Sequence, residues 1–202
     1  MTAFFFVRHG VTSHTGHRLS GWMPGIHLSE EGRAQAEAAA ATLANVPFKA
    51  IFSSPIERTM ETAEAIADRH GLEVQVTDAM GEVRYGRWTN RSFKALTRTK
   101  LWGTVHRFPS GVTFPEGESL RSVQARAVDE VERLRVEYPR KAVCCVSHAD
   151  VIKLIAAHYL GMHIDLFQRI DVGPASITTI TVTEDGPRVH ALNTIPRVPR
   201  ER

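Results

Sequence analysis

Two histidines and two arginines stand at the ends of apolar stretches of this sequence, where they could act on an anion. Arg8 and His9 directly follow the apolar run 4–7, Arg58 comes shortly after a second run, and His148 ends a third. A guanidinium offers a planar fork of donors that fits a phosphate. An imidazole can serve as a base, a metal ligand or a nucleophile. The set favours phosphoryl transfer, which needs mainly positioning and charge stabilisation.

The chemistry requires these residues to meet, and their places in the chain allow it. Short apolar runs are typical of buried strands, and ligands of open α/β sheets bind at the carboxyl ends of the strands. If the strands are parallel neighbours, Arg8, His9, Arg58 and His148 converge on a pocket for a dianion. Gly10 lets backbone approach a ligand closely. Glu82 stands at the rim of a further strand and could supply a proton.

Strands and helices are expected to alternate along most of the chain. The apolar patterns predict helices over 29–45, 119–138 and 149–160, with Ser29 and its following acids opening the first. Ser54, Pro55 and Glu57 predict a capping box for a helix that runs to His70 and stops at Gly71. We expect strands over 4–7, 49–53, 73–77, 142–146, 176–183 and 188–194, the last two as an edge hairpin joined by a turn at 184–187. The basic tail from Pro196 is expected to fray.

Residues 84–118 form an irregular, basic segment that we interpret as a lid-like insertion with one or two short helices. Two of its residues are acidic, Glu116 and Glu118. Its basic residues are Arg84, Arg87, Arg91, Lys94, Arg98, Lys100 and Arg107. Its balance of 7 − 2 = +5 exceeds the 25 − 22 = +3 of the whole chain. We therefore expect the segment to hold a second anionic group of a small substrate, although a solvated basic face is the alternative for each residue.

Length and composition suit a single domain over 1–202 and exclude several classes of protein. No apolar run approaches the ~18 residues of a membrane span, and the N-terminal apolar run lacks the flanks of a signal peptide. Cys144 and Cys145 are adjacent in an apolar run, which indicates buried strand residues and a reducing cytoplasm. Five lysines leave 25 − 5 = 20 arginines. These suit phosphate recognition or simply reflect arginine-rich codon usage.

Other histidines and the arginine excess raise two further hypotheses. His14, His17 and His27 lie near His9, but no i, i+4 pair, cysteine or paired carboxylate supports a metal site. The arginines carry no nucleic-acid-binding motif. We expect no metal, no cofactor, no nucleic acid and no membrane partner; the oligomeric state, including a homodimer, is left open.

The chain resembles the histidine phosphatase superfamily, the group that includes the cofactor-dependent phosphoglycerate mutases. The resemblance runs over most of the chain and is carried by residues 6–12, 20–22, 28–32, 51–63, Glu82 with Gly86 and Trp88, 115–119 and 146–148. It implies a three-layer α/β/α sandwich with a mostly parallel central sheet and no metal. It also implies that His9 is phosphorylated, that Arg8, Arg58 and His148 hold the phosphoryl oxygens, and that Glu82 is the proton donor. The pocket's charge would come from both arginines and a protonated His148.

The resemblance also implies a set of substrate contacts, with three departures from the family pattern. The contacts are Arg8, Thr12, Thr15, Gly21, Arg58, Arg84, His148 and Ala149. An asparagine is usual at Thr15, a Glu-Gly pair at Thr89-Asn90, and a glycine pair at Ala149-Asp150. Asp150 either brings a negative charge to an anion site or caps the helix that it begins.

The sequence favours a phosphatase that hydrolyses a phosphate monoester through a phosphohistidine. A phosphomutase of the phosphoglycerate mutase type is the alternative, but 84–118 lacks the paired arginines and proline run that the family's mutases share. A non-catalytic module that binds phosphorylated ligands is the alternative of another class. All five expected catalytic residues are present, which argues against it.

Overall fold

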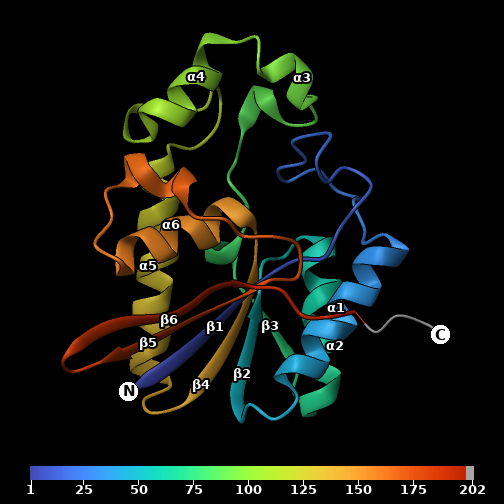
Figure 1. Cartoon of the computed structure of the whole chain (residues 1–202), viewed down its shortest axis with the longest axis vertical. Helices are drawn as coiled ribbons and strands as arrows, with labels where there is room; N and C mark the ends of the chain where they lie inside the picture. The colour runs from blue at the N-terminus through green and yellow to red at the C-terminus, as the bar shows by residue number, and fades with distance from the viewer. Residues whose placement is uncertain (199–202) are drawn as a thin grey trace.

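A single sheet crosses the middle of the molecule (Figure 1). The structure, a computed structural model, describes residues 1–198. Six strands of this part pair in the order β3-β2-β4-β1-β5-β6. Their bounds are β1 Thr2–Arg8, β2 Phe48–Ser53, β3 Val74–Val76, β4 Ala142–Ser147, β5 Ile177–Thr183 and β6 Gly186–Thr194. β1 to β4 pair parallel, whereas β5 runs antiparallel to β1 and β6. The mostly parallel sheet and the edge hairpin are therefore confirmed.

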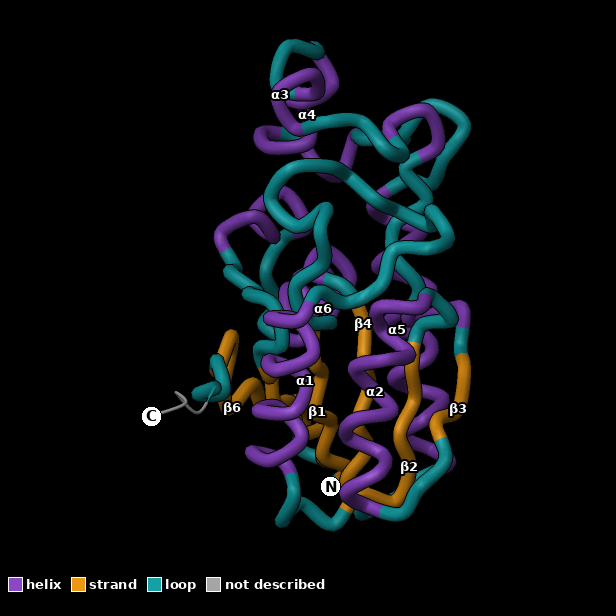
Figure 2. The backbone as a smooth tube through the Cα atoms, turned by 90° about the vertical axis from the view of Figure 1, so that its right-hand side faces the viewer, coloured by secondary structure: helices purple, strands orange, loops and turns teal. Residues whose placement is uncertain are grey.

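Helices cover both faces of this sheet, as expected for three layers (Figures 1 and 2). On one face lie α1 (Glu30–Leu43) and α2 (Glu57–His70), and on the other lie α5 (Leu120–Glu137) and α6 (Ala149–Tyr159). The pleat explains the sorting, because alternate side chains of a strand point to opposite faces. Phe6 packs into the cluster with α5 and α6, and the next residue, Val7, packs into the cluster with α1 and α2.

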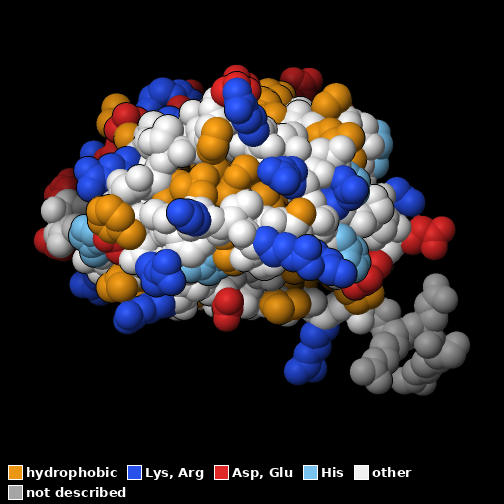
Figure 3. Space-filling view, turned by 90° about the horizontal axis from the view of Figure 1, so that it is seen from above, with side chains coloured by type: hydrophobic (Ala, Val, Ile, Leu, Met, Phe, Trp, Pro, Cys, Tyr) orange, Lys and Arg blue, Asp and Glu red, His pale blue; other side chains and the backbone are white. Residues whose placement is uncertain are grey.

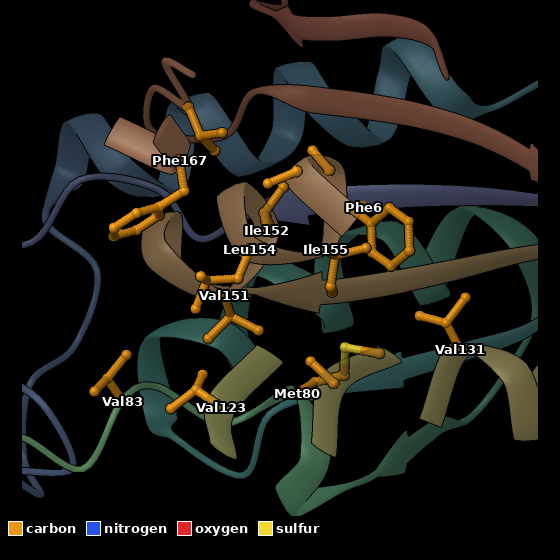
Figure 4. Packing of buried hydrophobic residues seen from close by; sticks show 14 of the residues in the cluster. Phe6, Met80, Val83, Val123, Val131, Val151, Ile152, Leu154, Ile155 and Phe167 are labelled. Carbon is orange, nitrogen blue, oxygen red and sulfur yellow. The ribbon is translucent and has the colours of Figure 1, made fainter. Parts of the chain in front are cut away.

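The larger core cluster lies between the sheet and α5 and α6. Figure 4 shows Phe6 of β1 beside Ile155 of α6. Val131 of α5 lies close by, as does Met80 from the connection that follows β3. All four side chains are fully buried. Because β1 and β4 lie in the centre of the sheet, both of their faces are covered, which explains their continuous apolar runs. This core fixes the positions of the strand ends that follow Val7 and Val146.

Short helices connect these layers. The 84–118 segment contains η2 (Gly86–Trp88), α3 (Phe93–Leu96), α4 (Lys100–Arg107) and η3 (Pro109–Gly111). Figure 1 shows α3 and α4 beyond the carboxyl end of the parallel strands. Two more 3₁₀ helices, η1 (Asp78–Met80) and η4 (Ile164–Arg169), lie between larger elements. The part of the basic tail in 199–202 falls outside the described residues.

The start of α2 differs from the predicted capping box. The helix begins at Glu57, and Ile56 precedes it without a side-chain cap. Ser54 is still part of the sheet, because its backbone N–H donates to the Val146 carbonyl at 3.1 Å. The helix consequently starts two residues later than predicted. The other predicted caps are confirmed: Ser29 accepts from the Gly32 N–H, and Gly71 ends α2 in the left-handed conformation.

Candidate active site

The parallel register of β2, β4 and β1 brings the predicted residues to one edge of the sheet. Arg8 pairs with Ser147, and Val146 pairs with Ser53, so the three strands end at the same level. His9 follows β1 and His148 follows β4, while Arg58 reaches the same point from the first turn of α2. Arg8, His9 and Arg58 line a cleft of about 240 Å³ together with Glu82, whereas His148 lies fully buried behind Arg58. The structure thus brings together Arg8, His9, Arg58, Glu82 and His148.

His9 is oriented by two hydrogen bonds that fix its tautomer. Its Nδ1 lies 2.7 Å from the Gly10 carbonyl oxygen, which can only accept, so Nδ1 carries the proton. Its Nε2 accepts from Nε of Arg58 at 3.2 Å. Burial and the charges of Arg58 and Arg8 hold the pKa of His9 well below its usual range. His9 therefore presents an unprotonated Nε2 at neutral pH, the form required of a nucleophile.

Gly10 serves a different purpose from the one predicted. A Cβ atom at Gly10 would lie 2.3 Å from the carbonyl oxygen of Gly32 in α1. The glycine therefore allows the loop after β1 to pass close to the first turn of α1, and the backbone it approaches is the protein's own. This contact holds His9 at the end of β1.

Arg58 is buried and Arg8 is half-buried, and each guanidinium keeps an N–H group that donates to no other group. Arg58 donates from Nη2 to the Gly21 carbonyl at 2.9 Å, and Arg8 donates from Nη1 to the Val172 carbonyl at 2.8 Å. Among the described residues, Arg58 Nη1 and Arg8 Nε are buried N–H groups without a hydrogen-bond partner. Such donors are costly unless something satisfies them. An anion in the cleft would supply the missing acceptors.

His148 is fully buried between Arg58 and Ser54. Its Nδ1 lies 3.2 Å from Arg58 Nη2, which can only donate, so Nδ1 is unprotonated and Nε2 donates to Ser54 Oγ at 2.9 Å. Burial and the Arg58 charge lower its pKa well below the usual range. The expectation of a protonated His148 is therefore wrong for the protein without a bound anion. Ser54, which the sequence assigned to a helix cap, orients this histidine.

The side chains of Trp22 and Arg126 hold the backbone of Glu82, and the pKa of its carboxyl group is raised. Its carbonyl accepts from Trp22 Nε1 and from Arg126 Nη2, and its carboxylate accepts from the Val83 N–H at 2.9 Å. Burial, together with the charge of Asp150, raises the pKa of Glu82 to about 7. One carboxylate oxygen lies 3.7 Å from His148 Nδ1. Glu82 can therefore be protonated near neutral pH in the cleft that His9 also lines.

Asp150 lines the cleft and does not cap α6. The residue at the cap position is His148, which makes no side-chain cap bond. Asp150 accepts from the hydroxyl of Tyr85 at 2.9 Å and lies 3.9 Å from Lys153 Nζ. The sequence reasoning missed Tyr85, because a lone tyrosine in an irregular segment carries no signal of where it points.

Four of the predicted substrate contacts line the cleft besides Arg8 and Arg58. Thr12, Thr15, Gly21 and Ala149 line the cleft with the catalytic set. Thr15 Oγ1 accepts from the Thr12 N–H at 3.0 Å, so its hydroxyl organises the loop. The Gly21 carbonyl is occupied by Arg58. Ala149 begins α6 directly after His148.

Arg84 does not belong to the cleft, which corrects its predicted role. Its guanidinium stacks on Trp22 at 3.8 Å from the ring centre and lies 3.6 Å from Glu118 and 3.7 Å from Asp78. Arg87 pairs with Glu116 on the surface, and neither it nor Arg91 lines the cleft. The structure therefore shows no contact between these three arginines and the cleft, and the expected grip on a second anionic group stays a prediction. Two of the acids that pair with them, Glu116 and Glu118, belong to the same segment, and the third, Asp78, lies in η1.

Three further findings concern metal-binding groups, membrane-spanning helices and the two cysteines. Among residues 1–198, no group of three or more His, Cys, Asp or Glu side chains is placed to hold a metal ion. In the same part of the chain, no helix combines the length and apolar character needed to cross a bilayer. Cys144 and Cys145 are buried free thiols, as predicted.

Comparisons with known proteins agree with this geometry. The family model described as histidine phosphatase superfamily (branch 1) matches residues 4–195. Phosphoserine phosphatase 1 of Hydrogenobacter thermophilus is 31% identical over 78% of this chain and 75% of its own length. The 2,3-bisphosphoglycerate-dependent phosphoglycerate mutase of Thermoplasma acidophilum is 27% identical over 90% of this chain and 88% of its own. A solved mycobacterial glucosyl-3-phosphoglycerate phosphatase superposes with a TM-score of 0.86 at 26% identity, over 95% of this chain and 98% of that one.

Proposed function

The chain belongs to the histidine phosphatase superfamily, and we propose that it hydrolyses phosphate monoesters of small molecules through a phosphohistidine at His9. The observation that carries the proposal is the state of His9, whose unprotonated Nε2 faces two guanidiniums with unused buried donors. A nucleophile beside unfilled anion-binding groups is the arrangement that phosphoryl transfer requires. Phosphatases among the relatives support hydrolysis as the reaction.

In the first step, the phosphoryl oxygens of the ester accept from Arg8 Nε and Arg58 Nη1. His9 Nε2 forms a bond to phosphorus while the bond from phosphorus to the ester oxygen breaks. Glu82 transfers its proton to that oxygen, so the leaving group departs as a neutral alcohol. The Gly10 carbonyl stabilises the positive charge that develops on the imidazole through its hydrogen bond with Nδ1.

In the second step, water attacks phosphorus as the bond to Nε2 breaks. Glu82, now a carboxylate, takes a proton from that water, and inorganic phosphate leaves. His148 responds to the dianion, which offsets the positive charges of Arg58 and Arg8 that lower its pKa. Proton uptake at His148 Nδ1 then adds a donor to the phosphoryl oxygens. The two guanidiniums supply the rest of the charge, so the reaction as proposed uses no metal.

The cleft favours hydrolysis over a mutase reaction. A mutase must retain a bisphosphorylated intermediate, which carries a second dianion beyond the transferred group. Besides Arg8 and Arg58, the described residues of the cleft include one arginine, Arg18, and no lysine. Arg18 is exposed at the rim and donates to the carbonyl and side chain of Asn90. We also propose a reducing, cytoplasmic setting, which the two buried thiols support.

Rapid quench with a ³²P-labelled ester tests the proposal. Label that is lost in acid and stable in base should appear on the wild-type enzyme and be absent from His9→Ala. His17→Ala is the matched control, because His17 is an exposed histidine of the same loop outside the cleft. Undiminished label in His9→Ala would contradict the assignment of the nucleophile.

A further inference from the structure

The cleft has an apolar wall, although residues 84–118, which contribute most of it, are rich in basic side chains. Six side chains make this wall: Leu19, Trp88, Phe93, Trp102, Val105 and Phe114. Arg8 and His9 line the same cleft at the sheet edge. A leaving group attached to a phosphoryl group at His9 would therefore extend toward this apolar wall.

The aromatic members of the wall support one another. Trp88 and Trp102 stack at 6.2 Å between ring centres, and Phe114 meets Trp88 edge-on at 5.3 Å. Phe93 meets Trp102 at 6.0 Å and 65°. Trp88 and Phe114 are buried in the core, whereas Phe93 and Trp102 remain partly exposed. The wall thus combines a fixed base with two aromatic faces that a ligand can cover.

The wall has few charged neighbours: besides Arg8, Arg58 and Glu82, the charged side chains that line the cleft among the described residues are Arg18 and Asp150. None of the seven basic residues of 84–118 lines the cleft, and Figure 3 shows Lys and Arg side chains around a central group of hydrophobic ones on this face. His14 lines the cleft, and burial with the charge of Arg18 lowers its pKa. Inside the cleft, Asp150 adds a carboxylate. A second anionic group would meet this carboxylate and leave aromatic surface uncovered.

We infer that the preferred substrates carry an uncharged, flat apolar group, held against the wall formed by Phe93, Trp102 and their neighbours. This inference rests on the proposed phosphatase function and names its substrate class. Burial of apolar surface is favourable in proportion to the area removed from water, and aromatic pairs add a geometric preference. Phe93 and Trp102 are the specificity-determining residues, because their exposed ring faces are the part of the wall that a bound substrate can cover.

Three alkyl esters test the inference: 2-phenylethyl phosphate, ethyl phosphate and 3-phosphoglycerate. All three release an alkyl alcohol, so differences in kcat/KM report on the rest of the molecule. We expect kcat/KM for 2-phenylethyl phosphate to exceed both others by about tenfold or more, as burial of a phenyl ring implies. A preference for 3-phosphoglycerate would overturn the inference alone. Release of phosphate from none of the three would overturn the phosphatase assignment, and the inference with it.

Substitutions then test whether Phe93 and Trp102 cause the preference for 2-phenylethyl phosphate. Phe93→Ala and Trp102→Ala should each reduce the ratio of kcat/KM for 2-phenylethyl phosphate over ethyl phosphate by about fivefold to tenfold. Both esters are measured on one preparation, so any loss of folded protein cancels from the ratio. Phe108→Ala is the matched control, because Phe108 is a 55% exposed phenylalanine of the same segment outside the cleft. An unchanged ratio in both wall variants, or an equal fall in Phe108→Ala, would overturn the inference.

Discussion

Replacing Glu82 by glutamine should stabilise the fold at alkaline pH and change its stability little at acid pH. The Glu82 side chain is 12% exposed, and burial with the charge of Asp150 raises its pKa from 4.5 to about 7. The folded protein then holds this proton more tightly than the unfolded chain does. The contribution of Glu82 to stability therefore falls as pH rises from about 4.5 to about 7, where the folded carboxyl finally ionises.

The size of this effect follows from the two pKa values. They differ by about 2.5 pH units, and each unit corresponds to ~1.4 kcal/mol, so ionisation of Glu82 costs the fold about 3 kcal/mol. Glutamine keeps the shape of the side chain and can still accept from the Val83 N–H. It has no proton to lose in this range. The difference in unfolding free energy between Glu82→Gln and wild type should grow by about 3 kcal/mol across the range.

Urea unfolding of both proteins at several pH values from 4.5 to 8 measures this difference. Comparing the two proteins at each pH removes the contributions of groups that they share, including His9 and His148. Glu64→Gln is the matched control, since Glu64 is an exposed glutamate on α2. A difference between Glu82→Gln and wild type that stays constant with pH would refute the reasoning, because Glu82 would then have an ordinary pKa.

Three further predictions concern the reaction and the support of the site. Glu82→Gln should slow hydrolysis of alkyl phosphates by about 10²- to 10⁴-fold and of p-nitrophenyl phosphate much less, whereas equal losses would argue against a proton donor. Ser54→Ala leaves the Nε2–H of buried His148 without its acceptor and should cost about 1–3 kcal/mol in urea unfolding; unchanged stability would show that another acceptor takes over. A chelator should leave the rate unchanged, and activity that is lost to the chelator and restored by one divalent ion would contradict a site charged by arginines alone.

The strands that build the site were predictable because their apolar runs are short and bounded by polar residues. The runs before Arg8 and before Ser147 predicted buried central strands, and both lie in the middle of the sheet. Parallel pairing of neighbours then places His9 and His148 at one edge, with their rings 5.3 Å apart. Local pattern and fold class together were therefore sufficient to bring the histidines into one site.

The role of Ser54 was not predictable from local pattern. The sequence 54–57 satisfies the rule for a helix cap, but β2 keeps its pairing with β4 through the Ser54 N–H. Tertiary pairing thus overrides the local signal, and the hydroxyl that would have capped α2 holds His148 instead. The direction of Arg84 was equally hidden, because its partners Asp78 and Trp22 lie in other segments.

The 84–118 segment shows why the net charge of a segment does not predict which of its side chains line a cleft. Long basic side chains can keep their charged groups in water wherever their backbone lies. Trp88, Phe93, Trp102 and Phe114 of the same segment gain by leaving water, so they pack against one another and line the cleft. The basic side chains of the segment therefore lie outside the cleft, while the side that lines it is apolar.

The charges of the site also explain how one pH can suit both reacting groups. In the proposed reaction His9 must be unprotonated to attack phosphorus, and burial with the charges of Arg58 and Arg8 keeps it so by lowering its pKa well below its usual range. Glu82 must be protonated to release an alcohol, and burial with Asp150 raises its pKa to about 7. Had the two groups kept their ordinary values of 6.5 and 4.5, nearly all molecules with a free imidazole would carry an ionised Glu82. Burial, the two arginines proposed to bind the phosphoryl group and the acid at position 150 thus shift the two pKa values in the directions that the proposed reaction needs.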